Sequence, residues 1–226
     1  MKYRVKFTKH GVIKYIGHLD LLRYFQKAFR RTDVETIYSK GFSPHMMMSF
    51  ASPLGVGMEG YGEYFDVELG ENETPESVKE QLNAQMAEGI EIVDVIVLPD
   101  NFGNAMASVA ASDYELEFYR DNPLSPELIE AYNNAPAVTF IKNLKSGDIT
   151  VNAKEFVYEL YLKEENVLFA RVDSSSMNNL RPASLLQAML ALEGKDINDY
   201  PFHIVRKELY RRNNKGNLVP LGDIND

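Results

Sequence analysis

The chain has 226 residues, of which 45% are hydrophobic and 11% aromatic, and its formal net charge is −9 at pH 7. This length suits one large domain or two small ones, and the composition is typical of a globular protein with a buried core. No stretch approaches the roughly 20 apolar residues that span a bilayer, and the start lacks the continuous apolar centre of an export signal. We therefore expect a cytoplasmic protein with no membrane partner.

The chain contains no cysteine. This excludes disulfides, thiolate nucleophiles, zinc ribbons and cysteine-bound iron–sulfur clusters. Only four histidines are present, so a transition-metal site would depend on carboxylates, which suit harder ions. We therefore expect no cofactor and assign no metal ligand.

Charge is distributed unevenly along the sequence. Residues 1–45 contain ten Lys or Arg against three Asp or Glu, a net charge of +7, whereas the remaining residues carry −16. A local basic face can attract an anion although the whole chain is acidic.

The first hundred residues alternate between strand and helix patterns. Period-two alternation or short apolar runs predict strands near residues 3–7, 46–51, 63–69 and 90–98. Helical spacing of apolar residues predicts helices near residues 18–32 and 74–89, the second with Thr74 as N-cap and Pro75 at its first position. The order β, α, β, β, α, β is the split βαβ plan of the ferredoxin-like type.

The small and turn residues at 100–112 predict a domain boundary. Beyond it we expect strands near residues 114–118, 138–141 and 202–210, a hairpin pairing 156–162 with 167–172, and helices from 125 and over 182–192. This repeats the first plan loosely. We therefore predict an α+β protein of two tandem ferredoxin-like lobes with antiparallel sheets, residues 1–105 and 106–226, the second with an extra strand and a C-terminal tail.

The densest group of functional residue types lies between residues 14 and 69. Its motifs are Gly17, His18-Leu19-Asp20, Arg23, Ala28-Phe29-Arg30-Arg31 and Ser39-Lys40-Gly41-Phe42-Ser43-Pro44-His45. In these motifs the chain resembles the radical SAM-linked protein family, a domain of unknown function found beside or fused to radical SAM proteins with a cobalamin-type domain. The resemblance implies a radical SAM protein as partner.

Two positions depart from that family pattern. Gly17 stands where serine is usual, and Met46-Met47 replaces a usual Pro-Lys. The second change removes a positive charge, which weakens the expectation of tight binding to a polyanion.

Several basic and aromatic residues in this segment are candidates for RNA binding. Arginine's planar fork suits phosphate oxygens, and aromatic rings near a ferredoxin-like sheet can stack on unpaired bases. The alternatives are a solvated helix face for the cations and core packing for the aromatic rings. The candidates are Lys14, Arg23, Lys27, Arg30, Arg31, Tyr38, Ser39, Lys40 and Phe42.

Four residues are candidates for acid–base chemistry: His18, Asp20, His45 and Glu63. Asp20 lies at a helix start, where it could cap the helix or contact an anion together with His18. His45 is either a structural imidazole or a site residue. We predict that these four and Arg23 gather in one cleft, with Arg23 as the cationic partner that a buried Glu63 requires.

Three functions remain open at this stage. The first is an accessory or substrate-presenting module for a separate radical SAM enzyme in RNA or translation-related modification, such as tRNA modification, with no catalysis of its own. The second is an RNA-processing or acid–base enzyme that uses His18, Asp20, His45 and Glu63. The third is a protein-binding adaptor.

Overall fold

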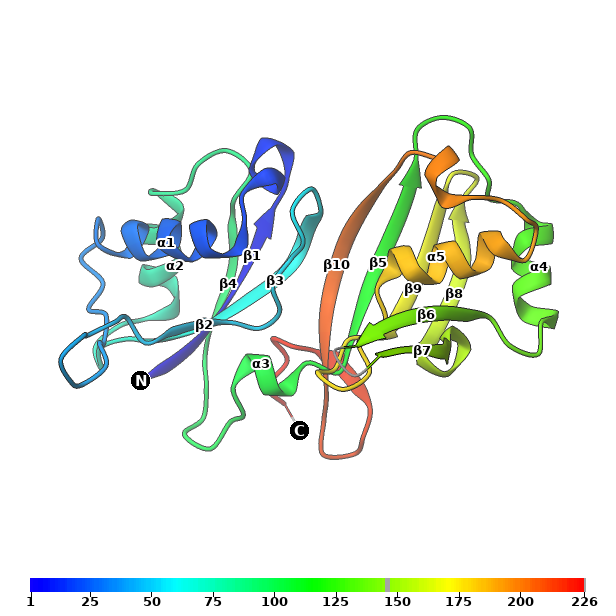
Figure 1. Cartoon of the computed structure of the whole chain (residues 1–226). Coiled ribbons are helices and arrows are strands. Elements are labelled where there is room, and N and C mark those ends of the chain that lie inside the picture. Colours follow the sequence, from blue (N-terminus) through cyan, green and yellow to red (C-terminus); the bar gives the residue numbers. More distant parts are fainter. Residues whose placement is uncertain (145–146, 226) are drawn as a thin grey trace. The chain divides into compact units, whose positions relative to one another are not determined.

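The computed structural model of the chain describes residues 1–144 and 147–225 and has a mixed α+β fold with mostly antiparallel strand pairing (Figure 1). The expected α+β class is confirmed. The chain divides into two compact units, the first made of Met1–Ala110 and the residues from Arg206 onward, the second of Ala111–Val205.

The first unit contains two longer helices and most of the strands of one sheet. Its elements are β1 (Lys2–Lys9), the 3₁₀ turn η1 (Gly11–Tyr15), α1 (His18–Phe29), β2 (Met48–Phe50), β3 (Glu59–Glu68), α2 (Pro75–Asn83), β4 (Ile92–Val97), α3 (Ala105–Ser108) and β11 (Leu218–Pro220). Strand β10 (Phe202–Arg212) starts in the second unit and ends in the first. The strands follow the order β4-β1-β3, then β10, with β2 paired to β3 and β11 to β10.

The two faces of this sheet are covered by different segments. On one face, Tyr3, Val5 and Phe7 of β1 form a single core with residues of α1 and α2. On the other face, Tyr64 packs with Leu221 of the C-terminal tail and with residues of α3. Successive side chains along a strand therefore point alternately into two buried surfaces. Neither face of this part of the sheet is the solvated face of a one-sided sheet.

Helix α1 follows the predicted amphipathic pattern. Its buried residues are Leu21, Phe25, Ala28 and Phe29, which recur at intervals of three and four and face the sheet. The helix ends at Phe29, three residues earlier than predicted. The predicted N-cap of α2 is confirmed, because the Thr74 side chain accepts a hydrogen bond from Ser77 N.

The second unit has its own strands and helices. They are β5 (Ala111–Phe118), α4 (Pro126–Asn134), β6 (Thr139–Leu144), β7 (Gly147–Asn152), the 3₁₀ turn η2 (Ala153–Phe156), β8 (Val157–Glu164), β9 (Val167–Asp173), α5 (Pro182–Ala191) and the 3₁₀ turn η3 (Ile197–Asp199). In the sheet, the strands of this unit follow the order β10, β5, β9 and β8, and only the start of β10 belongs to the unit.

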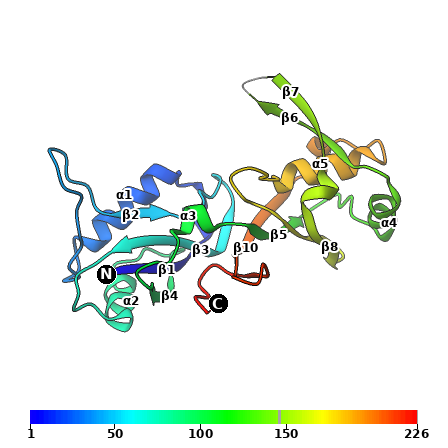
Figure 2. The same cartoon turned by 90° about the horizontal axis from the view of Figure 1, so that it is seen from below.

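Two hairpins characterise this unit. Strands β8 and β9 pair antiparallel, as the sequence predicted. Strands β6 and β7 pair only with each other among the described strands, and they stand apart from the other strands of this unit in Figure 2. The prediction for this half of the chain was one extra strand and not a hairpin.

The C-terminal segment belongs to a different unit than predicted. We predicted one lobe of residues 106–226, whereas in the structure the residues from 206 onward belong to the first unit. The reason is a set of polar contacts: Arg206 binds Glu63, and Glu208 binds Lys6 and Tyr64. These partners are distant in sequence, so no local pattern predicts them.

Candidate functional site

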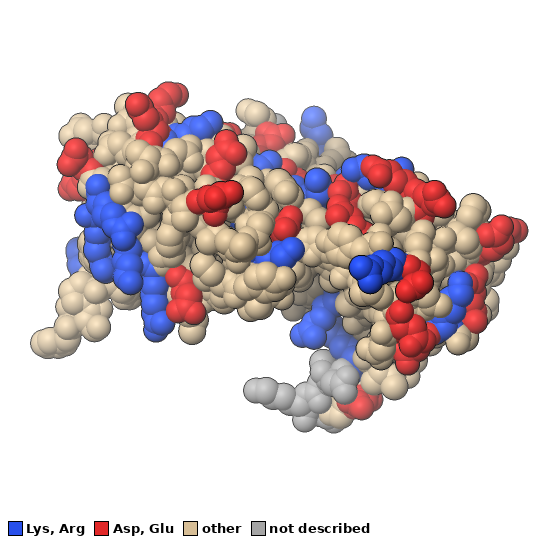
Figure 3. All heavy atoms as spheres, turned by 90° about the horizontal axis from the view of Figure 1, so that it is seen from above, with Lys and Arg blue, Asp and Glu red and all other residues tan. Residues whose placement is uncertain are grey.

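The exposed face of α1 and the two residues after the helix carry a row of cations. Arg23, Lys27, Arg30 and Arg31, here called the basic stripe, are all exposed and follow each other at steps of four, three and one residues. They lie opposite the buried residues of the helix because residues three or four apart share a helix face. Figure 3 shows Lys and Arg side chains gathered at the left-hand end of the first unit.

Asp20 begins the same exposed face and does not act as the helix cap. The N-cap of α1 is Gly17, which has no side chain to offer, and Asp20 forms an ion pair of 3.2 Å with Arg23 instead. Both side chains are about two thirds exposed, at 69% and 68%. Such a pair contributes little to stability, so both groups can exchange it for other partners.

The loop from Ser39 to His45, here called the 39–45 loop, is closed by its two end residues. Ser39 N donates to His45 O at 2.8 Å, His45 N donates to Ser39 Oγ at 3.1 Å, and Ser39 Oγ lies 2.8 Å from His45 Nδ1. Gly41 has a φ of 118°, which residues with a side chain rarely adopt. The loop is therefore ordered by its ends, and its tip residue Phe42 is fully exposed.

One residue joins this loop to the basic stripe. Tyr38, which precedes the loop and is 40% exposed, has its pKa lowered below the usual 10.0, chiefly because of the neighbouring Arg30 guanidinium. The Thr36 side chain acts in the same direction. The exposed ring of Tyr38 therefore lies beside the basic stripe.

Two of the predicted RNA-binding residues are occupied elsewhere. Lys14 forms an ion pair of 3.2 Å with Glu59 and is only 20% exposed, so it is not part of the basic stripe. Ser39 is held within the loop by His45. Lys40, by contrast, is exposed, two residues before Phe42.

The two histidines of the predicted site have different surroundings. His18 is half-buried at the first position of α1, with its ring edge-on to Phe50 at 5.1 Å. His45 is exposed and lines a cavity of about 200 Å³ together with Met46, Lys2 and Asp66. The other four predicted site residues are His18, Asp20, Arg23 and Glu63. None of them is among the described residues that line this cavity.

The prediction that Arg23 pairs with Glu63 is wrong. Glu63 is buried and accepts from Arg206, whose Nε lies 2.7 Å from Oε1 and whose Nη2 lies 2.5 Å from Oε2. Arg206 also donates to the carbonyl of Ser52 at 2.8 Å. The expectation that Glu63 is buried and paired was sound, but its partner comes from β10, a strand placed beside β3 only by the fold.

A buried lysine lies close to this ion pair. Lys9 is 1% exposed, and its Nζ donates to the carbonyls of Ile16 at 2.8 Å and Lys14 at 3.2 Å. Burial lowers its pKa below 10.5, while the negative charge of Glu63 acts in the opposite direction. The carbonyl acceptors and Glu63 together hold the start of α1 against β1 and β3.

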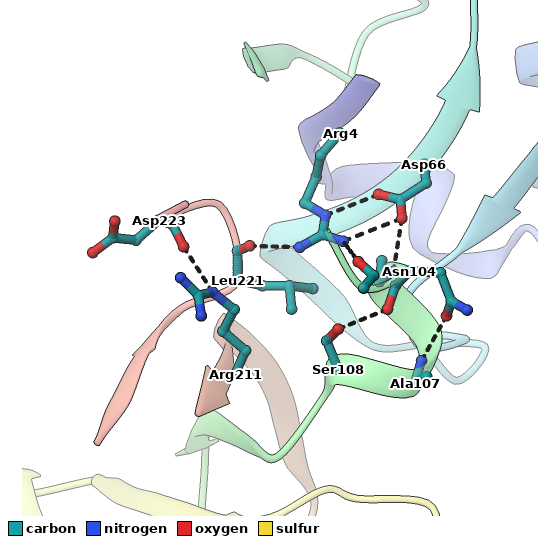
Figure 4. A network of polar contacts seen from close by, with 10 residues as sticks. Arg4, Asp66, Asn104, Ala107, Ser108, Arg211, Leu221 and Asp223 are labelled. Carbon is teal, nitrogen blue, oxygen red and sulfur yellow. Dashed lines mark hydrogen bonds and ion pairs between the residues drawn. The ribbon is translucent and has the colours of Figure 1, made fainter. Parts of the chain in front are cut away.

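A second buried network was missed by the sequence reasoning (Figure 4). Arg4 is fully buried and binds both carboxylate oxygens of Asp66, at 2.8 and 3.1 Å. It also donates to the carbonyls of Leu221 and Gly103. A signal existed, because Arg4 and Asp66 are opposite charges at directly paired positions of neighbouring strands, but recognising it required the register of β1 against β3.

The network ties the C-terminal tail to the first unit. Asp66 accepts a further bond from Ala105 N at the start of α3, and Arg211 donates to the carbonyl of Asp223 (Figure 4). The ring of Phe102 lies within 5.4 Å of the Arg4 guanidinium and 4.9 Å of that of Arg211. These groups are engaged with one another, so we assign them a structural role.

The described residues contain no group of three or more His, Cys, Asp or Glu side chains arranged to hold a metal ion. No helix in the described part of the chain has both the length and the apolar character needed to cross a membrane.

Comparison with protein families gives a match over residues 2–182 to a family described as an uncharacterized protein conserved in bacteria. The chain belongs to this family, DUF2344. The match includes the basic stripe, the 39–45 loop and most of the second unit. No curated protein matches the chain.

Three solved structures are similar to this DUF2344 protein over most of its length. The crystal structure of a Cbf5–Nop10–Gar1 complex is 13% identical with a TM-score of 0.48, and the match covers 92% of this chain and 48% of that one. An unknown protein from Galdieria sulphuraria is 12% identical with a TM-score of 0.27, covering 90% and 95%. The first two RRM domains of the yeast poly(U)-binding protein Pub1 are 12% identical with a TM-score of 0.19, covering 91% and 98%.

The chain thus spans about half the length of the Cbf5–Nop10–Gar1 chain that it matches.

Proposed function

We propose that this protein is a single-stranded RNA-binding module that presents RNA to a separate modifying enzyme and is not itself catalytic. The observation that supports this most is the combination of a fully exposed Phe42 at the tip of the 39–45 loop with a row of exposed cations, of which Arg30 neighbours Tyr38 just before that loop. An apolar ring at the tip of an ordered surface loop is accessible to a partner, and binding residues are often found on such loops.

Single-stranded RNA offers the two chemistries that this surface requires. Unpaired bases stack on aromatic side chains at about 1–3 kcal/mol each, and the phosphate backbone interacts with Arg and Lys. Phe42 and Tyr38 supply the stacking surfaces, and the basic stripe supplies the phosphate contacts. Arg30 serves both, because a guanidinium beside a phenol ring can reach the phosphate next to a stacked base.

The presenting role follows from what the candidate acid–base residues do. Glu63 is buried with both carboxylate oxygens bound by Arg206, so it is withdrawn from proton transfer to an outside substrate. Asp20 is exposed in its pair with Arg23. We therefore propose that the modifying enzyme is a second protein. The resemblance to the radical SAM-linked family supports a radical SAM protein acting in RNA or translation-related modification, such as tRNA modification.

We also propose a ferredoxin-like plan for each unit, within the α+β class. In the first unit, β4-β1-β3 with β2 paired to β3 is the arrangement that a split βαβ plan produces. In the second unit, the β6–β7 hairpin is inserted between α4 and β8. We therefore regard both units as variants of the ferredoxin-like plan, the second with this insertion.

The experiment uses the absence of tryptophan from the chain. Phe42→Trp places one fluorescent reporter at the loop tip, and titration with a single-stranded oligoribonucleotide is expected to quench it to saturation. Binding should weaken as salt rises, with a slope of log K on log salt of about −3 if four stripe cations each contact a phosphate. Arg30→Ala in this background should weaken binding about tenfold or more, as expected for a lost contact to a charged group.

The matched control is Arg120→Ala, which removes an exposed arginine of the second unit. It should leave the titration unchanged. Equal effects of the two arginine substitutions, or no quenching at low salt, would contradict the proposal. RNA that is shortened during incubation would instead support the RNA-processing enzyme.

A further inference from the structure

A second cavity lies in the second unit, between β6 and α5. Its volume is about 420 Å³, which falls within the size range of small-molecule sites, roughly 300–1,000 Å³. Phe140 and Lys142 of β6 line one side, and Ser184 and Gln187 of α5 line the other. Arg181, directly before α5, also lines it, together with Asn179, Ile141 and Ser176.

The charge of this lining is opposite to that of its surroundings. Residues 111–205 contain fifteen Asp or Glu against eight Lys or Arg. Yet the residues lining the cavity include Lys142 and Arg181 and no carboxylate. Two cations close together in an acidic unit repel each other, so their placement costs free energy unless an anion joins them.

Four other cations of this unit have partners within it, whereas the exposed Arg120 has no carboxylate partner among the described residues. Lys163, Arg171 and Lys195 bind the carboxylates of Glu115, Asp113 and Glu193. Lys154 donates to three backbone carbonyls at 2.8–3.1 Å. Lys142 and Arg181, by contrast, have no carboxylate partner in the described part of the chain, and both line the same cavity.

We propose that this cavity binds a nucleoside phosphate. Arg181 and Lys142 bind the phosphate, for which a planar fork and a point charge are both suited. The ring of Phe140 offers a stacking surface for a base, and the amides of Asn179 and Gln187 can both donate to and accept from its polar edge. The proposal is independent of the RNA-binding role, because none of these residues belongs to the basic stripe or the 39–45 loop.

The test places a single tryptophan in the cavity by Phe140→Trp. Titration with adenosine monophosphate is expected to quench it to saturation, and calorimetry on the unsubstituted protein should give one site per chain. Arg181→Gln should weaken binding about tenfold or more, whereas Arg120→Gln, an exposed arginine of the same unit outside the cavity, should not change it. Circular dichroism of each variant checks that the fold is retained.

Two comparisons with other ligands define the chemistry. Adenosine without phosphate should bind at least about tenfold more weakly, because the contacts to Arg181 and Lys142 are lost. Inorganic phosphate that binds as tightly as the nucleotide would overturn the assignment to a nucleoside phosphate. So would equal losses in the two arginine variants, or no saturable binding of adenosine monophosphate at millimolar concentration.

The same chemical group occurs in free nucleotides and at the phosphorylated end of an RNA. A short oligonucleotide with a 5′ phosphate distinguishes these sources: binding as tight as that of the mononucleotide places an RNA end in the cavity, and no binding places a free nucleotide there. Arg30→Ala should leave binding of adenosine monophosphate unchanged. A failure of the RNA titration at Phe42 and a failure here are therefore separate results.

Discussion

The Glu63–Arg206 pair joins residues that are 143 positions apart in the sequence and almost completely buried. A buried ion pair adds little net stability compared with an apolar pair of the same shape, but losing one partner leaves a charge without compensation. Gly60 shows how closely the pair is enclosed, because a Cβ at this position would lie 2.5 Å from Glu63 Oε1. The arrangement thus restricts substitution at three positions.

Arg206→Met is expected to lower the free energy of unfolding by about 3–5 kcal/mol, because Glu63 is left buried without its cation. Adding Glu63→Gln should restore part of this loss, since a neutral amide costs less to bury. Urea unfolding followed by circular dichroism measures both. The exposed Asp20–Arg23 pair is the control: Arg23→Ala should change stability by under about 1 kcal/mol. A loss of similar size in both single variants would be inconsistent with this account.

Tyr64 predicts how stability depends on alkaline pH. Burial raises the pKa of its phenol above 10.0, and the neighbouring Glu208 carboxylate raises it further. The neutral phenol is therefore favoured in the folded state, so its contribution to stability is complete below pH ~10 and is lost as the pH rises above the unfolded value. Stability should fall above this pH.

Tyr64→Phe keeps the ring but removes the hydroxyl that titrates and its 2.8 Å hydrogen bond to Glu208. It is expected to lower stability near pH 7 by about 1.5–3 kcal/mol and to make the decline above pH 10 less steep. Unfolding curves at a series of pH values measure the two effects separately. An unchanged alkaline slope would show that other groups control it.

At the scale of elements, the 39–45 loop combines an exposed tip with ordered ends. Two hydrogen bonds to Ser39 Oγ and one backbone bond link its ends, and Tyr38 pairs with Met46 just outside it. A loop that is ordered before binding loses less conformational entropy on binding. The loop therefore presents Phe42 to a ligand at low cost.

Ser39→Ala removes the hydroxyl that bonds His45 and should loosen the loop without unfolding the unit. We expect RNA binding to weaken about two- to tenfold, corresponding to ~0.5–1.5 kcal/mol, with little change in the melting temperature. Hydrogen exchange of the His45 amide should become faster, because its acceptor is lost. Slow exchange at His45 in the variant would show that the backbone bonds alone order the loop.

Local patterns predicted the elements well where each carries its own signal. The spacing of Leu21, Phe25 and Phe29 identified α1, and the turn between β8 and β9 identified their pairing. Both signals lie within a single helix or hairpin, where spacing alone determines which side chains share a face. The exposure of Lys27 also follows from helical spacing, whereas Phe42 lies in a loop, where no periodicity predicts exposure.

The buried polar partners could not be predicted in this way. Alternation along β1 placed Arg4 opposite the core residues, yet Arg4 is fully buried because α3 and the tail cover that face. The partner of Glu63 comes from β10 for the same reason. Such contacts depend on which strands become neighbours, and this is decided by the whole chain.

At the scale of the whole molecule, the two units differ in which parts of the chain form them. The second unit is one continuous segment, Ala111–Val205, whereas the first needs residues from both ends of the chain. The first unit therefore contains many contacts of long sequence separation, which slow folding because a large loop must close before they form.

Strand β10, which starts in one unit and ends in the other, has a consequence during synthesis. At roughly 5–20 residues per second, Arg206 leaves the ribosome about 7–29 s after Glu63, since 143 residues separate them. During that interval the second unit, Ala111–Val205, is still being synthesised, and Glu63 in β3 lacks its cation. The protein is therefore most in need of protection from aggregation and proteolysis after Glu63 has left the ribosome and before Arg206 has.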